Sequence, residues 1–348
     1  MDSRRHREII SYFHDTIGDG KQRVLLLGAT GETGGSILRA LLEDPDSFDV
    51  EALVRPASKD KPQVKALADR GIKTHLADIE GPIDGLVDIL AGVDVLISAI
   101  DAMSQLAQIK LVTAAKEAGV KRFVPCAFTT VAPAGGVMML RDTKEEVYQH
   151  IRKLYLPYTV IDVGYWYQLS FPTLPSGRVD YACMLKPKVE IHNGGSMPNI
   201  VTDERDIGSF VALIIKDPRT LNKYVVAYGD VLSENEIFEI MEELSGEKIE
   251  RKFVSLSLPT RSRLHAQKNA AVLKADPNNR LARIGVFRED YHYSKYVRGD
   301  NTPKYATYLG YFDARALYPD FKPKEFRAFA RELLDGKIEQ PYKDRVFA

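Results

Sequence analysis

Cysteine is scarce in this chain of 348 residues, which contains only Cys126 and Cys183. Two cysteines cannot build the disulfide framework of a small secreted domain or a four-cysteine metal site. The seven histidines are too scattered to complete a metal site with them, so we expect no metal. Long apolar runs are also missing, and none approaches the roughly 18 residues that a membrane span needs.

An excess of charge of either sign is absent as well, because Lys+Arg and Asp+Glu both number 48. This balance gives no electrostatic reason to expect a nucleic acid or an anionic membrane as a partner. The charged start of the chain, residues 1–22, lacks the apolar core of a secretory signal. We therefore expect a cytoplasmic protein, and the neutral net charge leaves monomer and homodimer open.

Apolar runs alternate with helical patterns through the first half of the chain. Hydrophobic residues make up 45% of the sequence, enough for a sizeable core. Strands alternating with helices of about 10–15 residues are typical of a doubly wound parallel sheet of the Rossmann type, an α/β fold. The strands are expected at 23–28, 49–55, 72–78, 93–100, 120–128 and 158–164.

The alternation is lost after residue 165, where aromatic residues, proline and glycine become frequent. We expect a short lead-in and a dinucleotide-binding domain over 1–165. A smaller α+β cap that binds the substrate is expected over 166–348, with segments at about 204–230 returning to the sheet. The lead-in itself has an amphipathic helical pattern.

A glycine loop follows the first expected strand and precedes a helical pattern. Gly28, Gly31 and Gly34 form a G-x-x-G-x-x-G in this stretch, with Thr30, Glu32 and Thr33 in between. Glycines in this context let the backbone turn tightly and approach a pyrophosphate, which the helix N-terminus attracts. The loop predicts a dinucleotide site, although an ordinary βα turn has the same composition.

The end of the second expected strand indicates which dinucleotide binds. An acidic residue there suits NAD, whereas an arginine suits the 2′-phosphate of NADP. The strand ends in Arg55, and Lys59, Lys61 and Lys65 follow it. A guanidinium with nearby ammonium groups favours NADPH/NADP⁺ as the cofactor, the alternative being a solvated run of charge.

Two further residues at strand ends are candidate cofactor contacts. Asp78 closes the third strand and is either an adenine-side contact or a local cap. Ser98 lies near the end of the fourth strand, at the same predicted edge of the sheet.

A lysine stands where helices usually avoid one. Thr143 and Glu146 have the T-x-x-E spacing of a capping box, which predicts a helix beginning at this point. Lys144 would then lie in the first turn, where the helix dipole disfavours a cation. Such a position, with partial burial, is expected to lower the lysine pKa and to suit it to proton transfer near neutral pH.

Several motifs together resemble one known family. The stretches "GATGETGG", "LVRP", "AAKEAGVKRFVP" and "LPYTVIDVGYW" are similar to the NmrA-like, isoflavone-reductase-like branch of the atypical short-chain dehydrogenases. The C-terminal "VRGDNTPKYATYLGYFDARALYPDF" resembles its fungal members. The resemblance extends from residue 23 to about 325. It implies an NADP-dependent oxidoreductase of secondary metabolism.

The resemblance also implies a role for Lys144. Family reductases carry a general acid/base lysine one helix before the "PYT" of the next strand, and Lys144 precedes "LPYT" in this way. The chain departs from the family where "PSEFG" is replaced by "PCAFTT", with Cys126 and Ala127 in place of Ser and Glu. Tyr148 replaces a frequent arginine one turn after the lysine and either donates a second hydrogen bond or only packs.

Aromatic residues leave the sixth expected strand at the edge where open α/β sheets bind ligands. Tyr165, Trp166, Tyr167 and Phe128 are expected to form a wall for a flat substrate, or else to belong to the core that joins the cap to the sheet. His192 is expected to be a hydrogen-bonded loop residue rather than a catalyst.

Three functions fit these patterns. The favoured one is an NADPH-dependent reductase of a small aromatic or polycyclic metabolite, with Lys144 as general acid/base. The second is an isomerase or rearrangement enzyme that uses the NADP-bound pocket without net redox chemistry. The third is an NmrA-like regulatory protein that senses dinucleotides, against which the presence of Lys144 argues.

Overall fold

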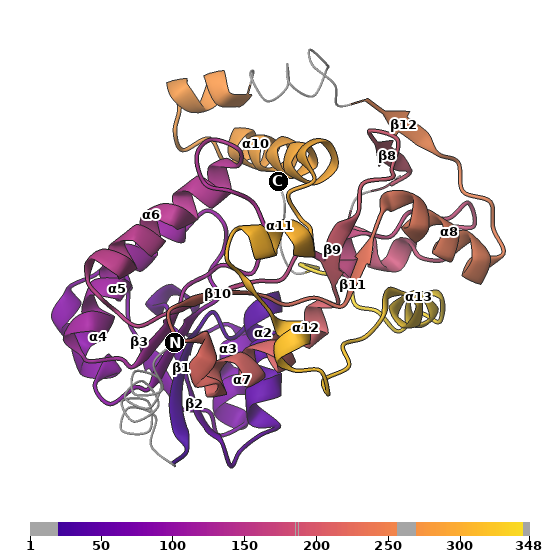
Figure 1. Ribbon diagram of the computed structural model, residues 1–348. Helices are drawn as coiled ribbons and strands as arrows, with labels where there is room; N and C mark the ends of the chain where they lie inside the picture. Colours follow the sequence, from indigo (N-terminus) through magenta and orange to yellow (C-terminus); the bar gives the residue numbers. More distant parts are fainter. Residues whose placement is uncertain (1–19, 185, 187, 256–268, 344–348) are drawn as a thin grey trace, which may run out of the picture. The chain divides into compact units, whose positions relative to one another are not determined.

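A computed structural model describes residues 20–184, 186, 188–255 and 269–343 (Figure 1). Most of the expected lead-in therefore lies outside the described residues. The chain divides into two compact units that interleave along the sequence. Unit 1 comprises the described residues up to 127 together with 144–161 and 207–225, and unit 2 comprises 128–143, 162–206 and the rest from 226.

Unit 1 is built on a parallel five-stranded sheet with the order β3-β2-β1-β4-β5. Strand β1 pairs with β2 on one side and with β4 on the other, so the strand order reverses between β1 and β4. Ligands bind at such switch points in open α/β sheets, outside the carboxyl ends of the strands. The strands are Gln22–Leu27 (β1), Phe48–Val54 (β2), Thr74–Leu76 (β3), Val95–Ser98 (β4) and Arg122–Val124 (β5).

Two strands from later in the chain extend the sheet beyond β5. A single bridge between Phe123 and Tyr158 places β6 (Thr159–Asp162) beside β5. Strand β10 (Lys223–Val226) then lies beside β6. Helix α7 (Ile207–Lys216), which precedes β10, packs against α2 (Glu32–Leu42), where Gly208 donates its N–H to the Ser36 hydroxyl at 3.0 Å.

Helices cover both faces of this sheet, which confirms the predicted Rossmann-type α/β fold (Figure 1). On one face α4 (Ile83–Leu90), α5 (Gln108–Glu117) and α6 (Met139–Lys153) bury aliphatic side chains against the strands. On the other face lie α2 and α7, while α3 (Pro62–Asp69) connects β2 to β3. A parallel sheet covered on both faces buries its strands completely, and Val24, Leu25 and Leu26 are indeed 0% exposed.

Unit 2 contains two small sheets and several helices. One sheet has the order β11-β9-β7, and the other pairs β12 with β8. Its core gathers the aromatic side chains of Tyr167, Phe171, Phe326 and Phe329. The elements are β7 (Tyr165–Trp166), β8 (Glu190–His192), β9 (Asn199–Thr202), β11 (Asp230–Leu232), α8 (Glu234–Ser245), β12 (Lys252–Val254), α10 (Arg280–His292), α11 (Pro303–Tyr308), β13 (Phe312–Asp313), α12 (Ala314–Leu317) and α13 (Phe326–Leu334).

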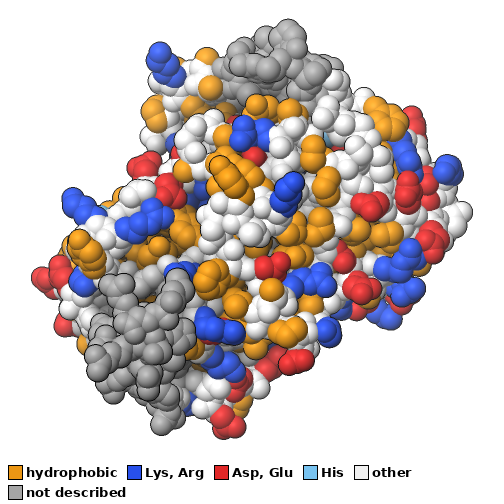
Figure 2. All heavy atoms as spheres, in the orientation of Figure 1, with side chains coloured by type: hydrophobic (Ala, Val, Ile, Leu, Met, Phe, Trp, Pro, Cys, Tyr) orange, Lys and Arg blue, Asp and Glu red, His pale blue; other side chains and the backbone are white. Residues whose placement is uncertain are grey.

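Short helical turns complete the two units. One of them, η7 (Tyr293–Arg298), is a π-helix that continues α10. The 3₁₀ turns are η1 (Pro56–Ser58), η2 (Gln105–Ala107), η3 (Tyr167–Leu169), η4 (Asp180–Ala182), η5 (Glu204–Asp206) and η6 (Pro218–Thr220). Acidic and basic side chains are interspersed on the face shown in Figure 2. None of the helices in the described residues is long and apolar enough to cross a membrane.

The predicted start of the helix that carries Lys144 is wrong. Helix α6 begins at Met139, so Lys144 lies in its second turn rather than its first. Thr143 does not cap the helix, because its hydroxyl donates to the Met139 carbonyl at 2.9 Å inside the helix. The N–H of Met139 is instead satisfied by the carboxylate of Asp290 at 2.8 Å, a partner distant in sequence. The dipole argument for an unusual lysine therefore fails.

A buried carboxylate ties together three strands of the unit 1 sheet. Glu51 in β2 accepts from Arg23 Nε at 3.0 Å and lies 2.5 Å from His75 Nε2 and 3.3 Å from Lys73 Nζ. Burial raises the pKa of Glu51, but the hydrogen bonds from Arg23, His75 and Lys73 outweigh burial and lower the pKa to about 2. The network stabilises the part of the sheet that carries the basic residues after β2.

Replacing Glu51 with glutamine is expected to lower the free energy of unfolding by about 2–3 kcal/mol at pH 7. The folded-state pKa lies below the ordinary value of 4.5, so this stabilisation is present above that value and is lost as pH falls towards 2. Urea unfolding of the wild type and the variant between pH 7 and pH 3 measures the difference. A difference that stays constant over this range would contradict the assignment.

Candidate functional site

The glycine loop forms a backbone cradle between β1 and α2. Gly28 has a φ of +89°, and an added Cβ there would lie 2.3 Å from the Ala99 carbonyl oxygen. Helix α2 begins after Gly31, whose extended backbone caps the helix without a side-chain hydrogen bond. The first N–H groups of such a helix attract an anion. Thr30 is exposed at this turn, and Glu32 and Thr33 follow as half-buried residues of the first turn.

Two neighbouring glycines in α2 differ in what a side chain would meet. A Cβ at Gly34 would lie 2.0 Å from the Gly28 carbonyl oxygen, whereas a Cβ at Gly35 would meet nothing closer than the Ala29 oxygen at 3.9 Å. Gly34 thus permits the close packing of the helix on the strand end. Gly35 has no such requirement.

This pair gives a matched test of the cradle. Gly34→Ala is expected to lower the free energy of unfolding by at least about 2 kcal/mol, because the new methyl group would force α2 away from the glycine loop. Gly35→Ala is expected to be neutral or to stabilise by up to about 1 kcal/mol through helix propensity. Chemical denaturation of both variants measures the contrast, and equal stabilities would show that the close approach does not exist.

The predicted phosphate-binding residues lie beyond the carboxyl end of β2. Arg55 follows β2 directly and forms the N-cap of η1, and its side chain is exposed. Lys59 and Lys61 follow η1, and Lys65 lies in α3; all three side chains are exposed. The structure therefore presents four cations to solvent on one β–α connection, next to the strand that carries the glycine loop.

Asp78 and Ser98 lie at other strand ends of unit 1. Asp78 is exposed, and its Oδ1 accepts from the Glu80 N–H at 3.0 Å, which makes it the cap of a turn. Ser98 is the last residue of β4 and pairs with Leu27, the residue before Gly28. Its hydroxyl oxygen is buried and has no hydrogen-bond partner among the described residues. A buried hydroxyl of this kind beside the cradle is available to a ligand.

Lys144 is only 3% exposed and points to the carboxyl ends of β4 and β5. Its ammonium donates to the carbonyl of Cys126 at 2.5 Å, to that of Ala127 at 3.0 Å and to Gln105 Oε1 at 3.2 Å. The two carbonyls lie just after β5, and Gln105 is the first residue of the turn η2, which follows β4. The structure thus holds Lys144 at the same edge of the unit 1 sheet as the glycine loop.

The residues around Lys144 form a small polar network. Gln108 Nε2 donates to Gln105 Oε1 at 3.2 Å, and Gln108 Oε1 accepts from the Cys126 N–H at 2.9 Å. The Cys126 thiol donates to the Ile100 carbonyl at 3.1 Å. Cys126 and Ala127, the two residues that depart from the family pattern, both offer backbone oxygens to the lysine, and the Cys126 sulfur also lies 3.9 Å from its Nζ.

The first turn of α6 is fixed within unit 2. Arg141 donates to the Asp162 carboxylate at 2.6 Å and to the Thr130 carbonyl at 2.7 Å, and both members of this ion pair are buried. The Tyr311 hydroxyl donates to the same Asp162 oxygen at 2.6 Å. Together with the Asp290 cap, these bonds determine where α6 begins.

Tyr148 lies one turn after Lys144, but its ring belongs to the core of unit 1. The residue is 1% exposed and packs with the aliphatic cluster formed by α4, α5 and α6. Its ring meets that of Tyr224 edge-on, with centroids 6.0 Å apart. The Tyr148 ring therefore contributes to this core, and a second hydrogen bond from its hydroxyl to a substrate stays a prediction.

The four aromatic residues of the expected wall are not brought together. Tyr165 lines a cavity, whereas Tyr167 is buried in the unit 2 core, where its hydroxyl donates to Asp230 at 2.8 Å. The Trp166 ring stacks on Tyr342, with centroids 5.8 Å apart. Phe128 is buried and adopts a φ of +43°, a strained conformation for an aromatic residue, directly after the Ala127 carbonyl that Lys144 contacts.

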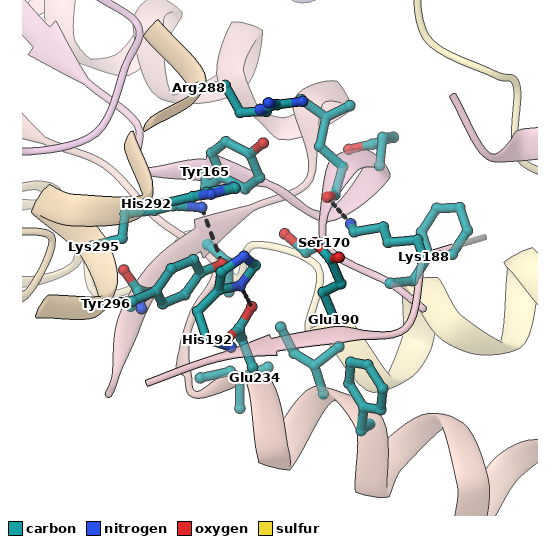
Figure 3. A pocket seen from close by; sticks show the side chains of 18 of the residues that line it. Tyr165, Ser170, Lys188, Glu190, His192, Glu234, Arg288, His292, Lys295 and Tyr296 are labelled. Atoms are coloured by element: carbon teal, nitrogen blue, oxygen red, sulfur yellow. Dashed lines mark hydrogen bonds and ion pairs between the residues drawn. The ribbon is translucent and has the colours of Figure 1, made fainter. Parts of the chain in front are cut away.

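The cavity that Tyr165 lines has a volume of about 610 Å³ and lies entirely within unit 2 (Figure 3). Ligand pockets of drug-sized molecules have volumes of this order. Lys188, His192, Glu234, Arg288 and Lys295 face it with their polar groups. Sequence reasoning missed these residues except His192, which is hydrogen-bonded as expected but ends strand β8.

Comparison with known proteins decides the family. Residues 20–275 match the model of the NmrA-like family. The chain belongs to the NmrA-like family. An asnovolin J 5′,6′-dehydrogenase of Aspergillus novofumigatus is 41% identical over 319 residues, which cover 91% of this chain and 97% of the relative. A probable pinoresinol-lariciresinol reductase of Arabidopsis thaliana is 29% identical, with coverage of 90% and 98%.

Solved structures of plant reductases have the same fold as this NmrA-like protein. The leucoanthocyanidin reductase of Vitis vinifera in complex with NADPH superposes with a TM-score of 0.72 at 23% identity, covering 90% of this chain and 99% of that one. A structure from a study of pinoresinol-lariciresinol and phenylcoumaran benzylic ether reductases gives 0.70 at 26% identity, with coverage of 90% and 100%. The predicted family resemblance and the predicted fold are both confirmed.

Proposed function

We propose that this NmrA-like protein is an NADPH-dependent reductase of a small aromatic or polycyclic secondary metabolite, with Lys144 as its general acid/base. The observation that carries the proposal is the buried Lys144 ammonium at the sheet edge that also holds the glycine loop. The carbonyls of Cys126 and Ala127 hold the ammonium in place, and a buried proton donor at the ligand-binding edge of a Rossmann-type sheet is a candidate for catalysis.

The cradle of unit 1 fits a dinucleotide phosphate. The glycine loop and the N-terminus of α2 would hold the pyrophosphate, and the exposed Arg55 and Lys59 would hold a 2′-phosphate. The orphaned Ser98 hydroxyl would contribute a further hydrogen bond. When bound, the nicotinamide supplies the hydride that reduces a conjugated or carbonyl carbon of the substrate.

The hydrogen bonds of Lys144 support a route by which it would move a proton. An ammonium has three N–H groups, and here three oxygen atoms accept them. The two backbone carbonyls hold the two protons that a neutral amine keeps. The third proton is directed at the side chain of Gln105, whose oxygen is also engaged by Gln108. A substrate oxygen that displaces Gln105 would receive this proton as the adjacent carbon is reduced.

The named relatives support the class of reaction. The fungal relative is named as a dehydrogenase and the plant relative as a probable pinoresinol-lariciresinol reductase. Pinoresinol is a small aromatic molecule. The substrate of the present chain is proposed to belong to the same chemical class.

An assay with purified protein tests this function. NADPH is mixed with planar enones or with phenolic ethers, and its oxidation is followed together with the product. Substrate-dependent oxidation supports the reductase. Product formed without loss of NADPH would indicate an isomerase, and tight binding of NADPH without any turnover would indicate a dinucleotide sensor.

A further inference from the structure

The cavity of unit 2 has two chemically distinct walls. Its apolar wall consists of side chains from η3, β9, β11, α8 and the segments next to them, namely Phe171, Val201, Leu232, Ile237, Phe238 and Val254. The polar wall carries Lys188 from the loop before β8 and Lys295 from the π-helical turn η7 (Figure 3). A π-helical turn is frequent at functional sites.

Three carboxylates line the cavity, and each has a basic side chain beside it. Glu234 accepts the His192 backbone N–H at 2.7 Å and lies 2.9 Å from His192 Nδ1. Glu190 pairs with Lys252 at 2.9 Å, and Glu289 lies 3.3 Å from Arg288. These carboxylates are therefore engaged locally.

The two lysines have different partners. Lys295 is only 2% exposed, and its Nζ donates to the Tyr296 hydroxyl at 3.1 Å and lies 3.4 Å from the centre of the Tyr165 ring. Lys188 donates to the Leu169 carbonyl and lies over the Phe171 ring at 5.9 Å. Within the described chain both ammonium groups contact neutral oxygens and aromatic rings, and neither forms an ion pair with a carboxylate.

The charges around these lysines are only partly balanced. Burial lowers the pKa of Lys295 to about 7 and that of Lys188 to about 8, and the nearby charge of Glu234, which raises both pKa values, offsets burial only in part. A buried cation with incomplete compensation is unfavourable, and an anion bound beside both amines would relieve this cost. The apolar side chains that line the rest of the cavity, among them Phe171 and Phe238, would pack against a ring that carries the anionic group.

We infer that this cavity binds a planar ring compound that carries an ionised oxygen, either a carboxylate or an ionised enol, with the oxygen held by Lys295 and Lys188. The ring lies against the apolar wall of α8 and β9. The identification of this compound with the substrate rests on the proposed function, whereas the binding itself does not.

Calorimetric titration with 2-naphthoate and with its neutral analogue 2-naphthamide tests the inference. The wild type is expected to bind the carboxylate at least about tenfold more tightly than the amide. Lys295→Met is expected to remove this preference and to leave the affinity for the amide unchanged. Lys188→Met should reduce the preference by a smaller factor, because Lys188 is only half-buried.

Methionine is chosen because replacing a buried ion with an apolar side chain of similar length is usually tolerated. Melting curves establish that each variant is folded. Lys248→Met is the matched control, since this lysine is 88% exposed and does not line the cavity. The control should keep the wild-type preference.

Equal affinities for the two probes, no binding of either at millimolar concentration, or an undiminished preference in Lys295→Met would each overturn the inference. NADPH binding, measured separately, distinguishes this failure from failure of the proposed function. If the protein binds naphthoate through Lys295 but does not bind NADPH, the inference about the cavity stands and the proposed reductase function is wrong.

Discussion

Replacing Lys144 with methionine is expected to lower kcat for reduction of the ring substrate by about 10²–10⁴-fold, because the substrate oxygen loses its proton donor. The hydrogen bonds of Lys144 go to Gln105, Cys126 and Ala127, whereas the phosphates are assigned to the glycine loop and Arg55, so NADPH affinity should remain within about threefold of the wild-type value. Steady-state kinetics and nicotinamide fluorescence measure the two quantities. The stability of the variant is expected to fall by about 1–3 kcal/mol, because the carbonyls of Cys126 and Ala127 lose their donor.

A second lysine of the same helix provides the control. Lys153 lies in the last turn of α6 and is exposed, so Lys153→Met removes the same charge without touching the site. Its kcat should equal that of the wild type. If Lys144→Met retained more than about a tenth of the activity while folded, Lys144 would be a structural residue and the acid/base role would be wrong.

Replacing Arg55 with alanine is expected to weaken NADPH binding by about tenfold or more and to leave NADH binding nearly unchanged. The guanidinium is proposed to contact only the 2′-phosphate, which NADH lacks. Lys59→Ala should also weaken NADPH binding, but by a smaller factor. Fluorescence titrations with both nucleotides at low and high salt measure the preference, which should shrink at high salt because the groups are exposed.

Arg70→Ala is the matched control for Arg55. Arg70 is an exposed arginine at the C-terminal end of α3, whereas Arg55 lies before the N-terminal end of that helix. Its loss should not change the preference for NADPH. Equal losses of NADPH and NADH affinity in Arg55→Ala would show that this arginine does not recognise the 2′-phosphate.

The sheet of unit 1 was predictable because burial on both faces leaves a simple pattern. A strand covered by helices on each side is apolar throughout, as in Val24–Leu27, and such a run followed by glycine is visible in one sequence. The glycine loop was predictable for a related reason. Gly28 adopts a positive φ and touches Ala99, and few residues other than glycine tolerate either condition.

The two capping patterns of this chain show where local sequence stops being sufficient. Ser233 and Glu236 have the same spacing as Thr143 and Glu146 and form a real capping box at the start of α8. The pattern at Thr143 fails because Asp290 and Arg141 hold α6 one turn earlier. Tertiary packing brings these distant residues together, so a short stretch of sequence cannot predict their effect on where the helix begins.

The cavity could not be predicted for a similar reason. Lys188 and Lys295 lie more than a hundred residues apart, and neither belongs to a recognisable motif. The aromatic run at 165–167 was noticed, but Tyr165, Trp166 and Tyr167 turn to different surroundings. Tyr165 and Trp166 are successive residues of β7 and point in opposite directions, whereas Tyr167 begins the turn η3, so the run does not form a single wall.

Transfer of label from NADPH that carries two deuterium atoms at C4 of its nicotinamide tests the central claim most directly. The wild-type protein is incubated with this nucleotide and a panel of planar enones and phenolic ethers, and the products are examined by mass spectrometry. The reductase function predicts product that is one deuterium heavier, in an amount equal to the NADPH oxidised, and almost none with Lys144→Met. Unlabelled product, or NADPH that stays bound and intact with every compound, would contradict it.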